Sequence, residues 1–255
     1  MLPTIGFIDS YVLFLVLGIV AALVLFEYYF RKVLKEKESN IFYLEMTLIA
    51  AITIGILGAY LVQNLYDFIQ DPSSYHWEWK LTFFGGALFG VGGFIGLYML
   101  FAYKKYKEGL YNIFIIFPAC IALAHAFGRI GCFMEGCCYG LESDAWYAIY
   151  FPSLGKTVIP TQLFEMIFLF LLAGVLTYLA FKKRNHITLV VYAIGYGVWR
   201  FLIEFLRDDP RGQFIPGLTP SQFWAILLAV FGIGYLIFMI VRKKKTPPAT
   251  EEKEN

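Results

Sequence analysis

Residues 187–205 read ITLVVYAIGYGVWRFLIEF, a helix-length apolar run that contains one arginine, Arg200. At 1.5 Å per residue, a helix of this length covers most of the roughly 30 Å hydrocarbon core of a bilayer. An arginine in such a run costs several kcal/mol unless it is paired or hydrated, so it indicates a functional site. The stretch therefore predicts a membrane helix that contributes a cation to a site.

Six further apolar runs of similar length flank this stretch, at residues 11–29, 42–66, 83–103, 110–127, 162–181 and 223–241. The chain has 255 residues, of which 59% are apolar and only 16% charged, and its mean hydropathy is +0.65. This composition excludes a soluble domain and predicts an all-α polytopic membrane protein with seven transmembrane helices. We expect one domain over residues 1–242, with an ordered outer segment at 128–160 and a disordered cytoplasmic tail at 243–255.

The basic residues predict the orientation. Fifteen of the 21 Lys and Arg residues fall on one side, at 31–37, 104–107, 182–184 and from 242 onward. The positive-inside rule makes that side cytoplasmic, with the N-terminus outside and the C-terminus inside. The first run has Asp9 ahead of it and no basic leader, so it is predicted to be a retained helix rather than a signal peptide. The basic loops would face anionic lipid, and we predict no nucleic-acid partner.

A second cation, Arg129, follows the fourth apolar run. If this run enters the membrane from the cytoplasm near Leu110, Arg129 arrives at the outer interface, while Arg200 lies about 20 Å along the sixth helix. Long arginine side chains reach toward water. Two guanidinium groups at similar depth predict one anion site, for which a phospholipid phosphate is the natural ligand.

The sixth run places polar residues on one helix face. Tyr196, Arg200 and Glu204 are spaced four residues apart, and Arg207 follows three residues later. Glu204 can neutralise or orient Arg200, whose planar guanidinium offers two parallel hydrogen bonds to a phosphate. The alternative is a purely structural Arg–Glu pair that locks two helices.

Three more polar residues are expected at outer depth. His125 lies one turn below Arg129, where a neutral imidazole could act as a general base. The alternative is a buried histidine bonded to a backbone carbonyl. Gln162 and Glu165 open the fifth run as a polar pair, which otherwise only caps the helix.

The third run opens with Gly85 and Gly86 in FFGGALFGVGGFIG. Backbone N–H groups at a helix start could face a phosphate. The competing reading, which we favour for most of these glycines, is close packing of helices through small residues.

Three cysteines, Cys132, Cys137 and Cys138, fall in GRIGCFMEGCCYG, with Cys120 apart from them. The C-x4-C-C spacing lacks the paired C-x2-C of a zinc site, so we expect no metal. A disulfide from Cys132 to Cys137 or Cys138 on an oxidising exterior, and a role as small packing residues, both stay open.

Three segments resemble the prolipoprotein diacylglyceryl transferase family: HAFGRIGCFMEGCCYG at 125–140, PTQLFE at 160–165 and YGVWRFLIEFLRDDPRG at 196–212. The resemblance implies transfer of diacylglyceryl from phosphatidylglycerol to the lipobox cysteine thiol beside the signal peptide of a bacterial prolipoprotein, with release of glycerol 1-phosphate. It places the reaction at the outer leaflet of the cytoplasmic membrane. It implies no metal or diffusible cofactor, and we take a monomer as the working expectation.

The resemblance also implies residue roles. Arg129 and Arg200 would hold the lipid phosphate, with Tyr196 and Glu204 organising Arg200 and with His125 as a further catalytic group. The remaining expected substrate-binding positions are Arg207, Gly85, Gly86, Gly136, Gly140, Gln162 and Glu165.

Two departures from the family pattern matter. Phe84 stands where the family usually has a histidine proposed to help deprotonate the thiol. Cys132 replaces an Asn, and Glu135, Gly136 and Cys137 replace Asn-Gly-Glu. The thiol-activating role is thus unassigned unless His125 supplies it. A paralogous transferase with another acceptor, or a non-enzymatic protein that binds anionic lipid or transports anions, is the alternative.

Overall fold

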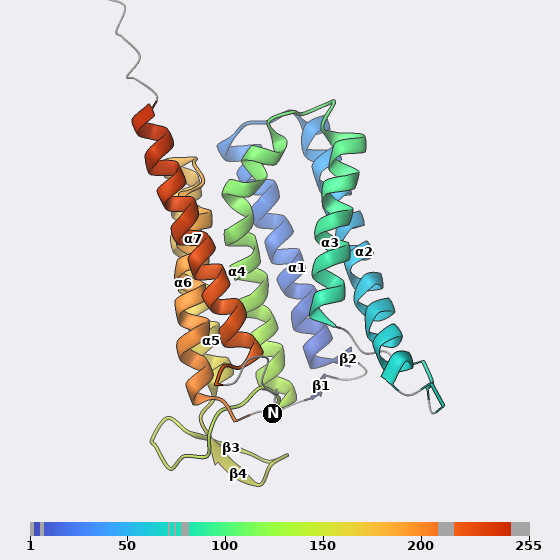
Figure 1. The fold of residues 1–255 in the computed structure, drawn as a ribbon, viewed down its shortest axis with the longest axis vertical. Coiled ribbons are helices and arrows are strands. Elements are labelled where there is room, and N and C mark those ends of the chain that lie inside the picture. Colours follow the sequence, from blue (N-terminus) through green and yellow to red (C-terminus); the bar gives the residue numbers. More distant parts are fainter. Residues whose placement is uncertain are drawn as a thin grey trace, which may run out of the picture. The chain divides into compact units, whose positions relative to one another are not determined.

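The computed structural model describes residues 3–5, 8–70, 72–73, 75–77, 82–208 and 217–245, without the side chains of residues 5, 8, 70, 83, 84, 87 and 243–245. Its elements are β1 (Thr4–Ile5), β2 (Ile8–Asp9), α1 (Ser10–Tyr28), α2 (Glu38–Gln70), α3 (Phe83–Leu97), α4 (Gly109–Glu135), β3 (Ile149–Phe151), β4 (Lys156–Val158), α5 (Thr161–Lys183), α6 (Ile187–Ile203) and α7 (Pro220–Lys245) (Figure 1). π-Helical turns at Tyr29–Val33 and Tyr98–Ala102 extend α1 and α3, and a 3-10 turn at Glu204–Leu206 extends α6.

The chain is an all-α polytopic membrane protein. Six described helices are long and apolar enough to cross a bilayer, namely α1, α2, α4, α5, α6 and α7. Their outward faces carry large apolar side chains, such as Leu171, Val230 and Leu61. Helices satisfy their backbone hydrogen bonds internally, which is what a segment in hydrocarbon requires. The third predicted span includes a shorter apolar helix, Leu88–Ala102, which comprises most of α3 and the π-helical turn after it.

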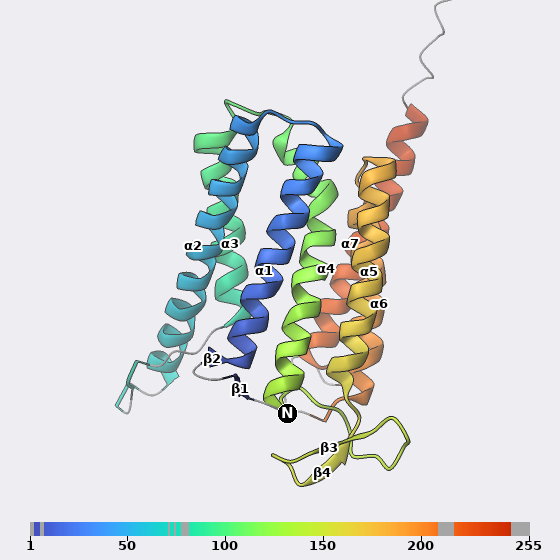
Figure 2. The ribbon, with the colours of Figure 1, turned by 180° about the vertical axis from the view of Figure 1, so that it is seen from behind.

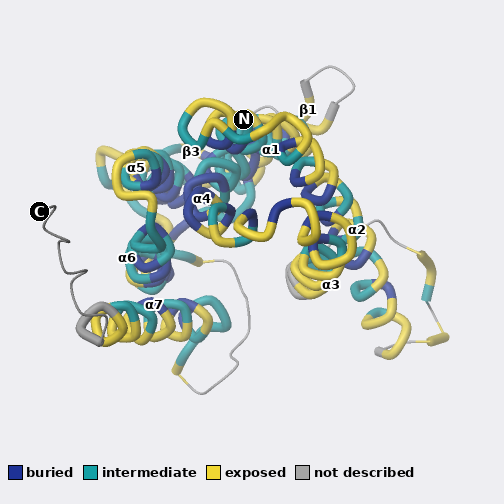
Figure 3. Tube along the Cα trace, turned by 90° about the horizontal axis from the view of Figure 1, so that it is seen from above, coloured by how far each residue is buried: buried dark blue, intermediate teal, exposed yellow. Residues whose placement is uncertain are grey.

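The chain forms two compact units, one of residues 1–26 with 114–255 and the other of residues 27–113. In the first unit, α4 lies between α1 and the pair α5 and α6 (Figures 1 and 2). Gly18 of α1 packs against the backbone of Ala124, which brings these helices into close contact. Buried residues line α4 (Figure 3). This helix is therefore the core of the unit, and polar groups on it are shielded from the surroundings.

In the second unit, α2 and α3 pack through glycines, as the small-residue pattern favours. A Cβ on Gly85 would lie 2.6 Å from the Gly58 carbonyl oxygen, and a Cβ on Gly55 would lie 3.1 Å from the Gly86 carbonyl oxygen. At the end of the unit opposite to the start of α3, the Tyr98 hydroxyl donates to the Tyr106 carbonyl at 2.7 Å.

The structure corrects the predicted end of the fourth helix. α4 continues to Glu135, so Arg129 lies inside the helix and not at its end. Gly128 and Gly131, which fall in the predicted outer segment, are helical, and Gly131 packs against the Tyr11 backbone. Gly136, with φ +81°, ends the helix, because a left-handed residue after the last turn favours glycine.

The connection between α4 and α5 is therefore residues 136–160, shorter than the predicted 128–160. It contains the antiparallel hairpin of β3 and β4, in which Ile149 pairs with Val158. At the other end of the chain, α7 runs to Lys245 and so includes the first three residues of the predicted tail. Residues 246–255 lie outside the described residues.

Candidate functional site

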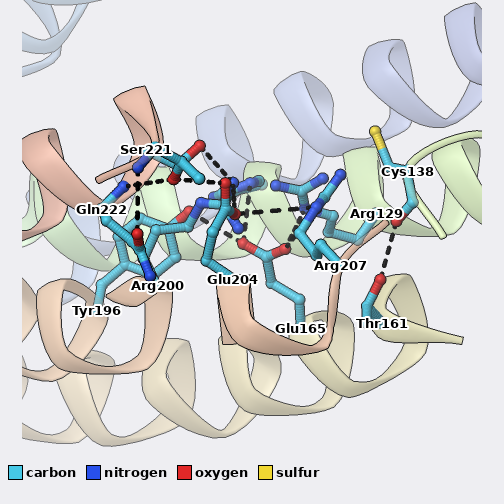
Figure 4. A network of polar contacts seen from close by, with 12 residues as sticks. Arg129, Cys138, Thr161, Glu165, Tyr196, Arg200, Glu204, Arg207, Ser221 and Gln222 are labelled. Atoms are coloured by element: carbon cyan, nitrogen blue, oxygen red, sulfur yellow. Dashed lines mark hydrogen bonds and ion pairs between the residues drawn. The ribbon is translucent and has the colours of Figure 1, made fainter. Parts of the chain in front are cut away.

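Glu165 forms the centre of a buried polar cluster in the first unit (Figure 4). The N-terminal part of α5 places its side chain, which is 0% exposed, against α4 and α6. Its Oε2 lies 2.9 Å from Arg129 Nε, and its Oε1 accepts a hydrogen bond of 3.0 Å from the Tyr196 hydroxyl. Sequence analysis had expected Tyr196 to organise Arg200, and the structure instead gives its hydroxyl to Glu165.

The predicted pair on α6 is confirmed. Arg200 Nη2 lies 2.9 Å from Glu204 Oε2, and both side chains are buried. The same Nη2 donates to Ser221 Oγ at 2.8 Å, and Thr219 Oγ1 donates to the other oxygen of Glu204 at 2.8 Å. The start of α7 thereby fixes the orientation of the α6 pair.

The start of α7 was missed by sequence reasoning, although it has a recognisable signal. Thr219 and Gln222 form a reciprocal cap, in which the Gln222 N–H donates to Thr219 Oγ1 at 3.2 Å and the Thr219 N–H donates to Gln222 Oε1 at 3.1 Å. Pro220 occupies the first helical position, where its fixed φ suits a helix start. A Thr-Pro-x-Gln motif therefore predicts the cap, but not its contact with Glu204.

Arg207 joins the two pairs. Its Nη1 lies 4.0 Å from Glu165 Oε2 and its Nε lies 3.9 Å from Glu204 Oε2, with a side chain only 2% exposed. An antiparallel bridge between Gly140 and Arg207 positions the backbone. A Cβ on Gly140 would overlap the Leu206 carbonyl oxygen, so only glycine allows this approach.

The connected side chains carry an excess of positive charge. Arg129, Arg200 and Arg207 are opposed by the carboxylates of Glu165 and Glu204; three positive and two negative charges leave one positive. In addition, Arg200 Nη1 is buried and has no hydrogen-bond partner among the described residues. A buried charge is costly unless it is paired, so this arrangement favours an anionic ligand.

His125 lies at the edge of the cluster. Its Nε2 is 4.0 Å from Glu165 Oε1, and its side chain is 28% exposed. Its ring meets that of Tyr196 edge to face, at 5.3 Å between centroids. His125 and Arg129, one helical turn apart, therefore both lie near the carboxylate of Glu165.

Gln162, Gly136 and Gly140, which were expected to bind substrate, have structural contacts. The Gln162 amide donates to the Cys137 carbonyl at 2.5 Å, Gly136 ends α4, and Gly140 supports Arg207. Gly86, in the second unit, donates its N–H to the Thr82 carbonyl at 3.2 Å, so this donor is already used. Phe84 lies outside the described side chains.

The cysteines of the signature converge. The sulfur atoms of Cys132, Cys137 and Cys138 all lie within 4.8 Å of one another. All four cysteines lie in the described part of the chain and none forms a disulfide. Cys120 is buried elsewhere on α4.

The chain was compared with known proteins. The model of the prolipoprotein diacylglyceryl transferase family matches residues 2–238. A phosphatidylglycerol–prolipoprotein diacylglyceryl transferase of Clostridium tetani is 34% identical over 249 residues, which cover 93% of this chain and 95% of that protein. A second such protein, from Clostridium perfringens, is 35% identical and covers 80% of this chain and 81% of its own length. One from Bordetella bronchiseptica is 30% identical, with 80% and 78% covered.

Proposed function

The chain belongs to the prolipoprotein diacylglyceryl transferase family, and we propose that its buried arginine cluster holds the phosphate of the donor lipid. The chain is a membrane transferase that moves a diacylglyceryl group from phosphatidylglycerol to a prolipoprotein. This is the activity for which its relatives are named. The proposal assigns the roles of individual residues in that transfer.

The main support for a phosphate site is the excess positive charge of the cluster. Three buried arginines face two carboxylates, and Arg200 Nη1 has no partner among the described residues. A phosphodiester supplies one negative charge and several acceptor oxygens, so its binding balances the cluster. Charge-assisted hydrogen bonds from arginine to phosphate are among the stronger ones in proteins.

The same cations would act on the leaving group. In the proposed reaction the lipobox thiol attacks the glycerol carbon of the diacylglyceryl group, a C–S bond forms and the C–O bond to phosphate breaks. The electron pair stays on the phosphate oxygen, and glycerol 1-phosphate leaves. Arg129 and Arg200 stabilise the charge that develops on this phosphate. Electrostatic stabilisation of this kind is usually the largest single contribution to catalysis.

His125 is the proposed acceptor of the thiol proton. Its Nε2 lies 4.0 Å from Glu165 Oε1, and its side chain is 28% exposed, so a substrate thiol can approach the ring. Glu165 would stabilise the imidazolium that forms, while Tyr196 holds the carboxylate in place through its 3.0 Å hydrogen bond. Glu204 positions Arg200, and Gly140 positions the backbone of Arg207. The segment that leads to Gly140 is held by the turn at Gly136 and by the hydrogen bond from Gln162.

The proposed setting is the bacterial inner membrane, with the site toward the outer leaflet. The basic loops and tail support a cytoplasmic C-terminus and an outer N-terminus. We count α3 with its π-helical turn, Phe83 to Ala102, as a seventh span. Twenty residues at 1.5 Å each reach about 30 Å, which matches the hydrocarbon thickness.

The test uses the purified full chain in detergent with phosphatidylglycerol and a lipobox peptide. Glycerol phosphate release and the mass gain of the peptide cysteine are measured together by mass spectrometry. Arg200→Lys should lower both about 100-fold, because a point charge does not reproduce the planar fork. The matched control is Arg31→Lys, an arginine that is 40% exposed and also paired with two carboxylates, which should keep full activity.

Retention of near-full activity in Arg200→Lys would refute the assignment of the phosphate site. Glycerol phosphate release without a mass gain on the peptide would indicate another acceptor. Lipid binding with neither product would favour the non-enzymatic alternative.

A further inference from the structure

The three-cysteine cluster lies beside the proposed catalytic site but has no part in the transfer mechanism. Cys132 is buried in the last turn of α4, whereas Cys137 and Cys138 follow directly after it and are half-buried. Their three sulfur atoms lie within 4.8 Å of one another. Chain spacing alone did not indicate this convergence, because the turn at Gly136 closes the four-residue gap.

The backbone holds the thiols in this arrangement. The N–H groups of Gly136 and Cys137 both donate to the Cys132 carbonyl at 3.1 Å. Cys138 has φ +62°, a left-handed conformation that is unfavourable for a non-glycine residue. Strained residues of this kind cluster at functional sites, and Cys138 carries the third sulfur atom of the group.

The start of α5 fixes the same segment from the other side. Thr161 Oγ1 donates to the Cys138 carbonyl at 2.9 Å, and the Gln162 amide donates to the Cys137 carbonyl at 2.5 Å. Both side chains are buried. The sulfur atoms are thus presented by a preformed scaffold, as a ligand set requires.

We propose that Cys132, Cys137 and Cys138 form a binding site for one thiophilic metal ion, of the class of Zn²⁺ and Cu⁺. With metal–sulfur bonds of about 2.3 Å, ligand sulfur atoms lie about 3.8 to 4.0 Å apart. The sulfur atoms lie within 4.8 Å of one another. Shifts of each side chain below about 1 Å would bring them to the spacing that a metal ion requires. Thiolate ligands select soft ions, whereas Mg²⁺ and Ca²⁺ require oxygen ligands.

The surrounding charges favour thiolates at this place. Arg129 interacts electrostatically with Cys132 and Cys138.

Binding involves no redox step. Each metal–sulfur bond replaces an S–H bond, and the thiol protons pass to solvent, so metal uptake releases protons. Zinc prefers four ligands. Glu135, whose Oε2 lies 3.8 Å from Cys137 Sγ, offers a carboxylate oxygen for the fourth position, and the bound ion would fasten the end of α4 to the segment that leads to Gly140.

The test measures metal content directly. The full chain is purified in detergent under a phosphine reductant, equilibrated with Zn²⁺ or, in a parallel arm, with Cu⁺, and analysed by elemental mass spectrometry after gel filtration. We expect one ion per chain. Co²⁺ as a spectroscopic probe should give a thiolate-to-metal charge-transfer absorption.

Cysteine variants identify the ligands. Loss of residues that merely support a metal ligand already lowers affinity about 10- to 100-fold, so Cys137→Ser and Cys138→Ser should each lower it at least about 100-fold. Cys120→Ser, which removes the one cysteine outside the cluster, should leave it unchanged. Cys132→Ser completes the set, and if this buried change prevents folding, the two half-buried positions still decide the outcome.

The proposal is overturned if the reduced chain binds no more Zn²⁺ or Cu⁺ than a variant in which Cys132, Cys137 and Cys138 are all replaced by serine. It is equally overturned if Cys120→Ser removes the bound ion as the cluster variants do. A mass deficit that shows a disulfide among the three thiols, persisting after incubation with metal and reductant, would also refute it. None of these results depends on transfer activity.

Discussion

Replacing Glu165 by glutamine tests the charge balance of the site. The substitution keeps the shape of a side chain that is 0% exposed, and removes a negative charge that faces both Arg129 at 2.9 Å and Arg207 at 4.0 Å. At an effective dielectric constant of about 20, the two attractions are about 6 and about 4 kcal/mol before desolvation is subtracted. Breaking a buried pair by removing one partner costs about 3–5 kcal/mol net.

The expected readout is thermal stability in an uncharged maltoside detergent. A loss of about 3–5 kcal/mol corresponds to a fall of about 6–20 °C in the melting temperature for a chain of this size. The change raises the net charge of the cluster from +1 to +2, so phosphatidylglycerol should bind the variant more tightly. Added lipid should therefore stabilise Glu165→Gln more than it stabilises the unsubstituted chain.

The matched control is Glu142→Gln. This carboxylate is also paired, with Lys156 Nζ at 3.0 Å, but it is 64% exposed, and an exposed pair contributes about 0–1 kcal/mol. Equal losses in the two variants, or equal stabilisation of Glu165→Gln and the unsubstituted chain by the lipid, would refute the reasoning.

Three further substitutions probe the proposed site. Tyr196→Phe removes one hydrogen bond to a charged acceptor, which is worth about 1.5–3 kcal/mol. Transfer in the peptide assay should therefore fall about 10- to 150-fold. Tyr192→Phe, which changes a ring stacked on Tyr196, should have little effect. His125→Gln should lower transfer about 10²- to 10⁴-fold near neutral pH. Its deficit should shrink as the pH rises past about 8.5, where the acceptor thiol ionises unaided, and a deficit that is constant with pH would contradict a role as base. Gly140→Ala should lower both melting temperature and transfer, because its Cβ overlaps the facing backbone, whereas Gly174→Ala, with open space around it, should leave both unchanged or slightly raise stability.

Local spacing on one helix was predictable from the chain. The Arg200–Glu204 pair follows from residues four apart on α6, and the structure confirms it at 2.9 Å. By the same logic His125 lies one turn from Arg129. Such neighbours are fixed by the helix period alone, so they do not depend on how helices pack.

The end of α4 was not predictable from glycine content. The predicted outer segment began at residue 128, yet Gly128 and Gly131 are both helical. An interior glycine costs a helix about 1 kcal/mol, whereas an unsatisfied backbone group in hydrocarbon costs several. The helix therefore continues through both glycines and ends at Gly136, where a left-handed residue is required.

The amino-acid sequence determined the membrane class, the apolar helices and the identity of the charged residues, because these depend on composition and on periods within one segment. Only the tertiary structure decided that Glu165 pairs with Arg129, that Arg207 links the two ion pairs, and that three thiols converge. These contacts join residues on different helices or across a turn. They depend on the rotation and depth of each helix against its neighbours, which side-chain packing sets and sequence spacing does not encode.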